Sequence, residues 1–440
     1  MYCNASQLCY NFGITFFLIL SEKDVEASIW LMLGVLLSFI FVIELGFTPT
    51  IQRFSSYSIN KDLKISNLNN FKFSLTELYF NAKSVYFFLS IISCLIIYFS
   101  GEIILNNLFE ISSNFSDNKL LFLLFIIKIF FYCNSIGLNA ILQGVGKMSI
   151  SKSVEGNIFL IKFLISIIFL LLGYSLSVVV LIDLLLTIIW FLYLSRLLLR
   201  YLNLKLIDFF NFDLKLNFIK NIFPTSLKWG GMQFGGYLIN YSSSVAVSQL
   251  SDPLIISSFL LTTRAINVIR LFSSAPILAE MPNYFMLFSK NDLKSIKYKL
   301  LSQINKPFYL FFSATSIILV ISFALEYNLL SFNNFILEPK LLIMLILMGF
   351  LELNHGLNAQ IYMGSNHIPF LFPGIISGLL ILFLQLEFAS FGVVYIILIQ
   401  AIVQACCNNW FPVYLNFNKL DINFITYIKA LFKFPKSILK

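Results

Sequence analysis

Residues 254–275 read LIISSFLLTTRAINVIRLFSSA, a mostly apolar run that carries Arg264 near its middle and Arg270 further along. About 20 apolar residues suffice for a helix to cross the roughly 30 Å hydrocarbon core of a bilayer. The run therefore predicts a membrane-spanning helix. An arginine buried in hydrocarbon costs at least about 2.5 kcal/mol, so such residues usually face a bundle interior or a water-filled cavity.

Four polar side chains of this run follow one another at three-residue steps. They are Arg264, Asn267, Arg270 and Ser273. That spacing places them on one slowly drifting stripe of a helix. A cationic stripe inside a membrane helix indicates an anionic ligand. The alternative is a pair of arginines neutralised by carboxylates or reaching the membrane surface, and it applies more to Arg270, nearer the helix end, than to Arg264.

The whole chain has the composition of a polytopic membrane protein. Of its 440 residues, 59% are hydrophobic and only 12% are charged, and its mean hydropathy is +0.87. A soluble domain carries roughly a quarter charged residues. The net charge of +9 does not indicate nucleic-acid binding, because the excess Lys and Arg lie in loops between apolar segments. No cleavable signal is evident, so we expect the first apolar segment to be retained as a helix.

Twelve membrane spans are predicted. They lie near residues 5–20, 28–51, 84–100, 119–142, 157–173, 176–195, 223–249, 254–277, 307–326, 339–358, 368–386 and 390–415. The loops after spans 2, 4, 6 and 8 and the C-terminal tail are basic, whereas the opposite loops are short and acidic. By the positive-inside rule, this alternation predicts an all-α polytopic membrane protein with both termini in the cytoplasm.

The longest basic connection divides the twelve spans into two sets of six. We expect an N-terminal six-helix lobe at 1–200, a cytoplasmic connector at 201–222, a C-terminal six-helix lobe at 223–418 and a basic cytoplasmic tail at 419–440. Because six is even, both lobes enter the membrane in the same orientation, which permits a parallel repeat. A short match between residues 60–64 (NKDLK) and 291–294 (NDLK) supports it.

Ionisable residues within the spans are candidates for function, because burying them is costly. Lys128 lies about nine residues into its span, roughly 14 Å deep at 1.5 Å per residue. We expect Lys128 and Arg264 to line a cavity for an anion such as a phosphate or pyrophosphate, to which arginine offers a bidentate fork. The predicted substrate-binding residues are Arg264, Lys128, Arg270, Lys162, Gln233, Asn240 and Asn267.

Gln233 and Asn240 belong to a span rich in amide and hydroxyl side chains, which suits sugar hydroxyl groups. The glycines of that span suit close helix packing equally well. Three carboxylates are candidates for proton or cation coupling, or alternatively for neutralising the basic residues: Glu44, Glu352 and Asp183. The alternative to a functional role is a place at the membrane surface, near the cytoplasmic interface for Lys162 and Glu352 and near the outer one for Asp183.

The sequence carries no catalytic pattern of the GxSxG, HExxH or GxxxxGK[ST] type. Its two histidines, His355 and His367, lie near one turn, and its six cysteines have no metal-type spacing with them. We therefore expect no catalytic residue, no metal site and no cofactor.

Six short motifs occur in order along the chain: Glu26-Ala-Ser-Ile-Trp30, Glu44-Leu-Gly-Phe-Thr-Pro49, Arg53-Phe54, Lys228-Trp229-Gly230, Thr262-Thr263-Arg264 and Gly364-Ser-Asn-His-Ile-Pro369-Phe370. With these motifs the chain resembles the polysaccharide biosynthesis proteins, the Wzx-type O-antigen repeat-unit flippases. This family belongs to the superfamily that also holds multidrug exporters and lipid II flippases. The resemblance covers essentially the whole chain in size, span count and topology.

The resemblance implies two six-helix lobes around a central cationic cavity, with one lobe rocking against the other. It implies a transporter in the bacterial inner membrane that moves an undecaprenyl-pyrophosphate-linked oligosaccharide from the cytoplasmic to the periplasmic leaflet. A gradient of H⁺ or Na⁺ would drive this translocation. Alternatively, consumption of the head group on the periplasmic side would give it direction without a coupling ion. Implied partners are the lipid bilayer, the polysaccharide polymerase and the chain-length machinery. The alternatives are a multidrug-type exporter of the same superfamily and a membrane glycan polymerase or ligase.

Overall fold

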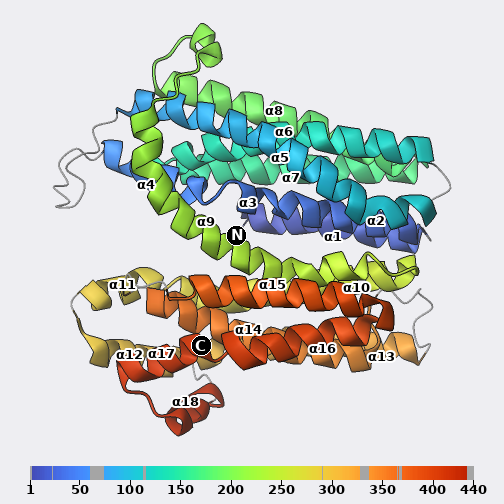
Figure 1. Ribbon diagram of the computed structural model, residues 1–440, viewed down its shortest axis with the longest axis vertical. Helices are drawn as coiled ribbons and strands as arrows, with labels where there is room; N and C mark the ends of the chain where they lie inside the picture. The colour runs from blue at the N-terminus through green and yellow to red at the C-terminus, as the bar shows by residue number, and fades with distance from the viewer. Residues whose placement is uncertain are drawn as a thin grey trace. The chain divides into compact units, whose positions relative to one another are not determined.

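The computed structural model describes residues 2–21, 23–59, 74–111, 115–289, 291–327, 336–363, 365 and 369–433. Those residues form helices joined by short connections, and no strand occurs among them. The prediction of an all-α polytopic membrane protein is confirmed. The chain divides into two compact units, Met1–Tyr237 and Leu238–Lys440 (Figure 1). The predicted lobes at 1–200 and 223–418 stay a prediction.

The first unit is built around α6, which packs against α5 and α8, while α1 packs against α7 (Figure 1). Its elements are α1 (Tyr2–Leu20), α2 (Asp24–Ser38), α3 (Ile40–Ile43), α4 (Phe47–Ile59), α5 (Leu75–Ile111), α6 (Phe115–Gly144), α7 (Met148–Leu171), α8 (Leu176–Tyr201), the 3₁₀ turn η1 (Leu206–Phe210) and most of α9 (Leu216–Val247).

In the second unit, α10 packs against α13 and α14, and α14 packs against α17. Its elements are α10 (Pro253–Leu278), α11 (Met281–Ser289), α12 (Leu293–Gln303), α13 (Asn305–Glu326), α14 (Pro339–Met363), α15 (Leu371–Phe388), the 3₁₀ turn η2 (Ala389–Phe391), α16 (Val393–Val403), η3 (Gln404–Asn408), α17 (Phe411–Leu420) and α18 (Phe424–Leu431). The element η3 is a single turn of π-helix.

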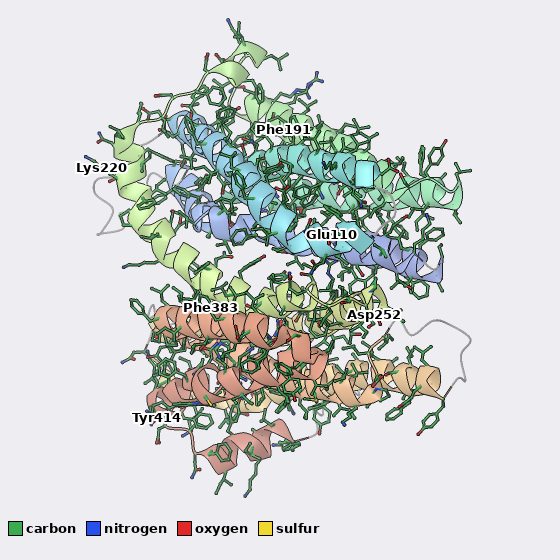
Figure 2. All side chains as sticks on the ribbon, turned by 45° about the vertical axis from the view of Figure 1, so that its right-hand side comes forward. Glu110, Phe191, Lys220, Asp252, Phe383 and Tyr414 are labelled. Carbon is green, nitrogen blue, oxygen red and sulfur yellow. The ribbon has the colours of Figure 1, made fainter. Side chains whose placement is uncertain are left out.

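Ten helical stretches within the described residues are long and apolar enough to cross a membrane. Two predicted spans are not among the ten: the first, which is the shorter apolar helix Ser6–Leu20, and the seventh, which is α9. Large apolar side chains such as Phe99 and Phe383 stay more than 60% exposed, and Figure 2 shows Phe383 on α15 among other carbon-rich side chains. Such a surface suits contact with lipid.

Several predictions fall on residues outside the described ranges. They concern the match at residues 60–64, the loop lysines Lys61, Lys64 and Lys72, the histidine His367, most of the motif at 364–370, and residues 434–440 of the tail.

The predicted arginine helix is α10, and its start follows from two neighbouring residues. Asp252 caps it by accepting the Leu254 N–H at 2.9 Å, and Pro253 occupies the first helical turn. A carboxylate satisfies an otherwise unpaired N–H, and proline at the first helical position has no N–H to lose. The helix therefore begins at a fixed residue, which sets the depth of both arginines along it.

The helix of the span predicted near residues 28–51 is interrupted. The chain forms α2, α3 and α4 there, with Leu45 at φ 49° and Gly46 at φ 72° between α3 and α4. Glycine takes this left-handed conformation freely, whereas it costs other residues about 1–2 kcal/mol. The span predicted over 390–415 is likewise divided, by the π-turn η3.

The break after α3 packs tightly against α9. A Cβ atom on Gly230 would lie 2.6 Å from the Leu45 backbone, and a Cβ on Gly46 would lie 2.7 Å from the Ser226 carbonyl oxygen. Both contacts involve backbone, which cannot rotate aside as a side chain can. Glycine on each side is what lets the two segments approach this closely.

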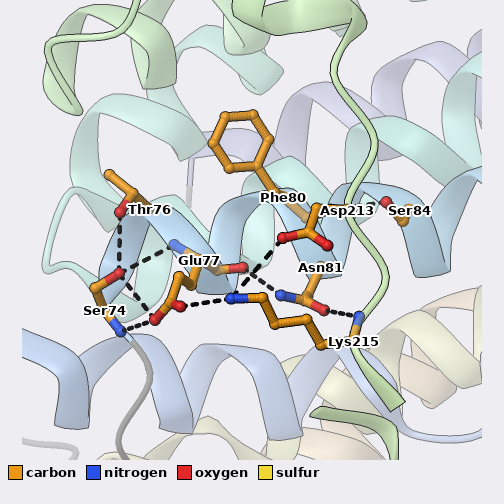
Figure 3. Close-up of polar contacts among 8 residues, drawn as sticks. All are labelled: Ser74, Thr76, Glu77, Phe80, Asn81, Ser84, Asp213 and Lys215. Carbon is orange, nitrogen blue, oxygen red and sulfur yellow. Dashed lines mark hydrogen bonds and ion pairs between the residues drawn. The ribbon is translucent and has the colours of Figure 1, made fainter. Parts of the chain in front are cut away.

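The helix α5 begins with a capping box (Figure 3). The Ser74 N–H donates to Glu77 Oε2 at 3.0 Å, and the Glu77 N–H donates to Ser74 Oγ at 3.2 Å. Lys215 Nζ donates to the other oxygen of Glu77 at 2.6 Å, and the Lys215 N–H donates to Asn81 at 2.7 Å. The hydrogen bond to Glu77 raises the pKa of the Lys215 ammonium. The connector is thus held on α5 directly before α9.

Lys83 gives α5 a second, buried hold on the connector. Its Nζ donates to the carbonyl oxygens of Phe209 at 2.6 Å and Asn211 at 2.5 Å. It also lies 4.5 Å from the centre of the Phe212 ring. Two carbonyls and an aromatic face replace the water that a buried ammonium loses.

We expect Gly230→Ala to lower the free energy of unfolding by about 1–3 kcal/mol, since the added Cβ overpacks the contact with Leu45. The measurement is the Tm of the purified protein in detergent. Gly236→Ala on the same helix is the matched control, because a Cβ there meets nothing within 4 Å. Equal Tm values for both variants would show that the close approach is unnecessary.

Candidate functional site

Three buried charged side chains meet inside the first unit. Lys128 on α6 and Lys162 on α7 each contact one carboxylate oxygen of Asp183 on α8, the second at 2.5 Å. No side chain of the three is more than 9% exposed. We call these residues the lysine–aspartate cluster. Two ammonium groups and one carboxylate give it a formal charge of +1.

Neighbouring groups complete the coordination of the two ammonium groups. Thr187 lies one turn after Asp183 on α8, and its hydroxyl accepts from Lys162 Nζ at 2.8 Å while donating to the Asp183 carbonyl at 2.7 Å. The rings of Phe125 and Phe159 each lie 5.4 Å from one of the ammonium groups. Buried charges persist only where such partners replace water.

The lysine–aspartate cluster borders a cavity of about 50 Å³. Amide and aromatic side chains of α1 and α2 complete its wall, including Gln7, Tyr10, Asn11 and Trp30. The Tyr10 and Trp30 rings pack edge to face with centroids 5.5 Å apart. The wall therefore offers positive charge, hydrogen-bonding groups and aromatic surface at one place inside the unit.

The alternative that places Lys162 near the cytoplasmic interface and Asp183 near the outer one is wrong. Their direct contact places both at one level, buried together with Lys128. The error arose because each residue was placed by its position along its own span, whereas the ion pairs depend on how the three helices are aligned. Asp183 is thus the counter-ion of two lysines.

Glu44 has different surroundings from the other two predicted coupling acids. It lies 2% exposed at the end of α3. Its Oε2 accepts from the Thr48 hydroxyl at 2.6 Å and the Tyr86 hydroxyl at 3.4 Å. Within the described residues it makes no ion pair with a basic side chain. A buried carboxylate without a cation is costly, and the cost falls when it takes up a proton or a cation.

The second unit holds another ion pair, between Arg270 on α10 and Glu352 on α14. Arg270 also donates to the Asn240 side-chain oxygen at 3.1 Å. Glu352 accepts from Gln404 at 2.8 Å and from Gln400 at 3.4 Å. Of the predicted residues, the structure therefore brings Arg270, Asn240 and Glu352 together.

Sequence analysis missed the buried glutamines of the second unit. Gln400 donates to the Ile239 carbonyl at 3.0 Å, and Ser243 donates to Gln400. Gln385 donates to Ser243 at 2.9 Å. Gln404, which contacts Glu352, opens the π-turn η3, a rare geometry that often marks functional sites. Glutamine in an apolar span was the available signal, since a buried amide needs partners.

The remaining predicted residues lie on α9, α10 and α14. Arg264 and Asn267 are half-buried on α10, and Gln233 is half-buried on α9. Tyr241 lies near Arg264. His355 is hydrogen-bonded through Nδ1 to the Asn408 carbonyl at 2.8 Å. Across the described part of the chain, no group of His, Cys, Asp and Glu is arranged to hold a metal ion.

We expect Asp183→Asn to destabilise the protein by about 3–5 kcal/mol, because it leaves two buried lysines without their counter-ion. The measurement is thermal unfolding in detergent. Asp213→Asn, whose side chain is 53% exposed, is the control and should stay near wild type. A small loss for Asp183→Asn would mean that water reaches the two ammonium groups.

No protein-family model matches this chain, and no curated protein matches it either. Solved structures do resemble it. An outward-facing multidrug resistance MATE family transporter of the MOP superfamily has a TM-score of 0.57 at 14% identity and covers 98% of this chain and 94% of its own. An inward-facing structure of such a transporter has a TM-score of 0.55 at 12% identity over 95% and 96%.

The lipid II flippase MurJ in an inward closed conformation has a TM-score of 0.55 at 15% identity, covering 96% of this chain and 89% of its own. At these identities the likeness concerns the fold. This chain has the polytopic helical fold of MOP superfamily transporters over essentially its whole length.

Proposed function

We propose that this chain is a flippase for a lipid-linked oligosaccharide. It would carry an undecaprenyl-pyrophosphate-linked repeat unit of O-antigen or a related polysaccharide from the cytoplasmic to the periplasmic leaflet by alternating access. Its place would be the bacterial inner membrane, with both termini in the cytoplasm. The observation that carries the proposal is the excess of buried positive charge, represented by the lysine–aspartate cluster.

The charge balance fits an anionic cargo. A sugar pyrophosphate cannot enter hydrocarbon alone, since an isolated buried charge is prohibitive. The predicted site residues include four basic side chains and three acidic ones. The basic ones are Lys128, Lys162, Arg264 and Arg270, and the acidic ones are Glu44, Asp183 and Glu352. Guanidinium groups match phosphate oxygens in pairs. The two arginines of α10 are therefore the proposed contacts of the pyrophosphate. The proposed contacts of the sugar hydroxyls are the half-buried side chains Gln233, Asn240 and Asn267.

The structural likeness to the lipid II flippase MurJ supports the same class of cargo. The likeness to MATE multidrug transporters favours an alternative, export of small molecules. Cationic drugs would favour a cavity in which acids prevail, and here the buried bases outnumber the acids. We therefore rank the flippase first. A polysaccharide polymerase and the chain-length machinery would act after it.

We expect Arg264→Ala and Lys128→Ala each to abolish surface glycan while the protein stays in the membrane. Each substitution removes positive charge that would stabilise the pyrophosphate. The measurement is glycan display in a deletion strain that carries the variant, with membrane protein quantified in parallel.

Lys147→Ala removes an exposed lysine and serves as the control, with normal glycan expected. Full display by both Arg264→Ala and Lys128→Ala would contradict the proposal. Normal glycan together with increased sensitivity to cationic drugs in the deletion strain would favour the exporter.

Glu44 is the proposed coupling site, since Asp183 and Glu352 already neutralise basic side chains. Its hydroxyl partners Thr48 and Tyr86 can donate to a carboxylate or accept from a carboxylic acid. The same site lies one residue before the Leu45–Gly46 break. Proton or cation uptake would therefore occur where the helix is already interrupted.

We expect Glu44→Gln to remove the response of transport to an ion gradient, because an amide keeps the shape but takes up no proton. The measurement is translocation of a lipid-linked repeat unit in membrane vesicles, with and without an imposed H⁺ or Na⁺ gradient. Glu110→Gln, an exposed carboxylate on α5 (Figure 2), is the control. An unchanged gradient response in Glu44→Gln would exclude Glu44 as the coupling site.

A further inference from the structure

The lysine–aspartate cluster has one more positive charge than its carboxylate balances. Both oxygens of Asp183 are engaged, one by Lys128 and one by Lys162. The next acidic side chain on α7, Glu155, pairs with Lys152 at 2.7 Å. Within the described residues, no further carboxylate pairs with either lysine of the cluster. A net charge buried among apolar helices needs a counter-ion.

A second observation points to the same cavity. Trp30 lines it and is only 6% exposed. Its Nε1 has no hydrogen-bond partner within the described part of the chain. An indole N–H is a donor and nothing else, and a buried donor normally has an acceptor. The residues that line the cavity thus include an N–H donor without an acceptor and two ammonium groups, a combination that suits an anion.

The size of the cavity limits what the anion is. Its volume is about 50 Å³, and one water molecule needs roughly 10–15 Å³ of such space. By that measure the cavity holds about three to five water molecules, so a halide or another small anion fits, whereas a pyrophosphate with its attached sugar does not. Aromatic side chains, among them Trp30, Phe125 and Phe159, form part of the cavity wall.

We propose that this cavity is a binding site for one small monovalent anion, chloride in the cell, held by Lys128, Lys162 and the Trp30 indole. The site lies wholly within the first unit and would exist in a flippase and in an exporter alike. Its role in transport rests on the proposed flippase function: the ion would balance the cluster's charge only while no pyrophosphate is bound, and the arginines of α10 remain the proposed direct contacts of the pyrophosphate. A small organic anion with one carboxylate group, such as acetate, has the same charge as chloride. The experiment below distinguishes acetate from halide.

The experiment uses the purified full-length protein in detergent at constant ionic strength, with gluconate replaced stepwise by chloride, bromide, acetate or sulfate. We expect Tm to rise with chloride and bromide to a saturating value, because an ion that binds only the folded state stabilises it. Sulfate should have no saturable effect. A rise with acetate but not with halide would overturn the assignment to chloride.

Two variants test the proposed donors. Trp30→Phe keeps an aromatic ring but removes the N–H, and it should weaken halide binding at least about tenfold, the value of one hydrogen bond to a charged group. Lys162→Met removes the excess charge and should abolish the halide response. Trp410→Phe, at an exposed indole already bonded to the Cys406 carbonyl, and Lys147→Met are the matched controls.

Direct location of the ion keeps the test decisive if Lys162→Met does not fold. Crystals of the wild type grown in bromide should show an anomalous peak between Trp30 and the two lysines, and crystals of Trp30→Phe should show a weaker one. A wild-type site that holds water only, or a halide response equal in Trp30→Phe and Trp410→Phe, would overturn the proposal. Neither readout involves glycan, so failure here is distinct from failure of the flippase proposal.

Discussion

Asp183 receives two ammonium groups inside the first unit, and the alignment of three long helices depends on that carboxylate. Lys128, Lys162 and Asp183 come from α6, α7 and α8. Contact between lipid and the apolar side chains of these helices does not fix the position of a helix along its axis. Apolar contact alone specifies the depth of a helix poorly, because one leucine against lipid resembles another. The hydrogen-bonded contact between an ammonium and a carboxylate is broken if either partner moves by a few ångströms, although part of the Coulomb attraction persists. The lysine–aspartate cluster therefore places the buried charges and also sets the alignment of α6, α7 and α8 along their axes.

The second unit also holds few buried charges, and uncharged side chains complete their hydrogen bonds. Arg270 contacts a carboxylate and an amide from two other helices, and Glu352 accepts hydrogen bonds from two glutamine side chains. Neutral amides satisfy the remaining lone pairs of the carboxylate without adding another charge to bury. Both units thus combine a few ions with many uncharged partners. Glu44 is the exception, since hydroxyl groups are its only described partners.

Helix positions could largely be read from the sequence, whereas the contacts between helices could not. The run at 254–275 predicted α10, and its bounds follow from Asp252 and Pro253, both local features. The break at Leu45–Gly46 was missed because hydropathy does not register backbone angles. The partners of Lys128 were missed because Asp183 lies 55 residues later on another helix, and helix rotation is set by packing. The residue types of the site were predictable, but their pairing was not.

The π-turn at Gln404–Asn408 has a consequence for everything that follows it. A turn that holds one extra residue displaces each later side chain by about 100° around the helix axis, the angle that one residue occupies in an α-helix. Asn416 on α17, which begins after a bend at residues 409–410, donates to the Asn358 carbonyl at 2.7 Å. The π-turn and the bend together therefore set the rotation at which α17 meets α14, and a deletion in the π-turn would change which side chains of α17 face α14.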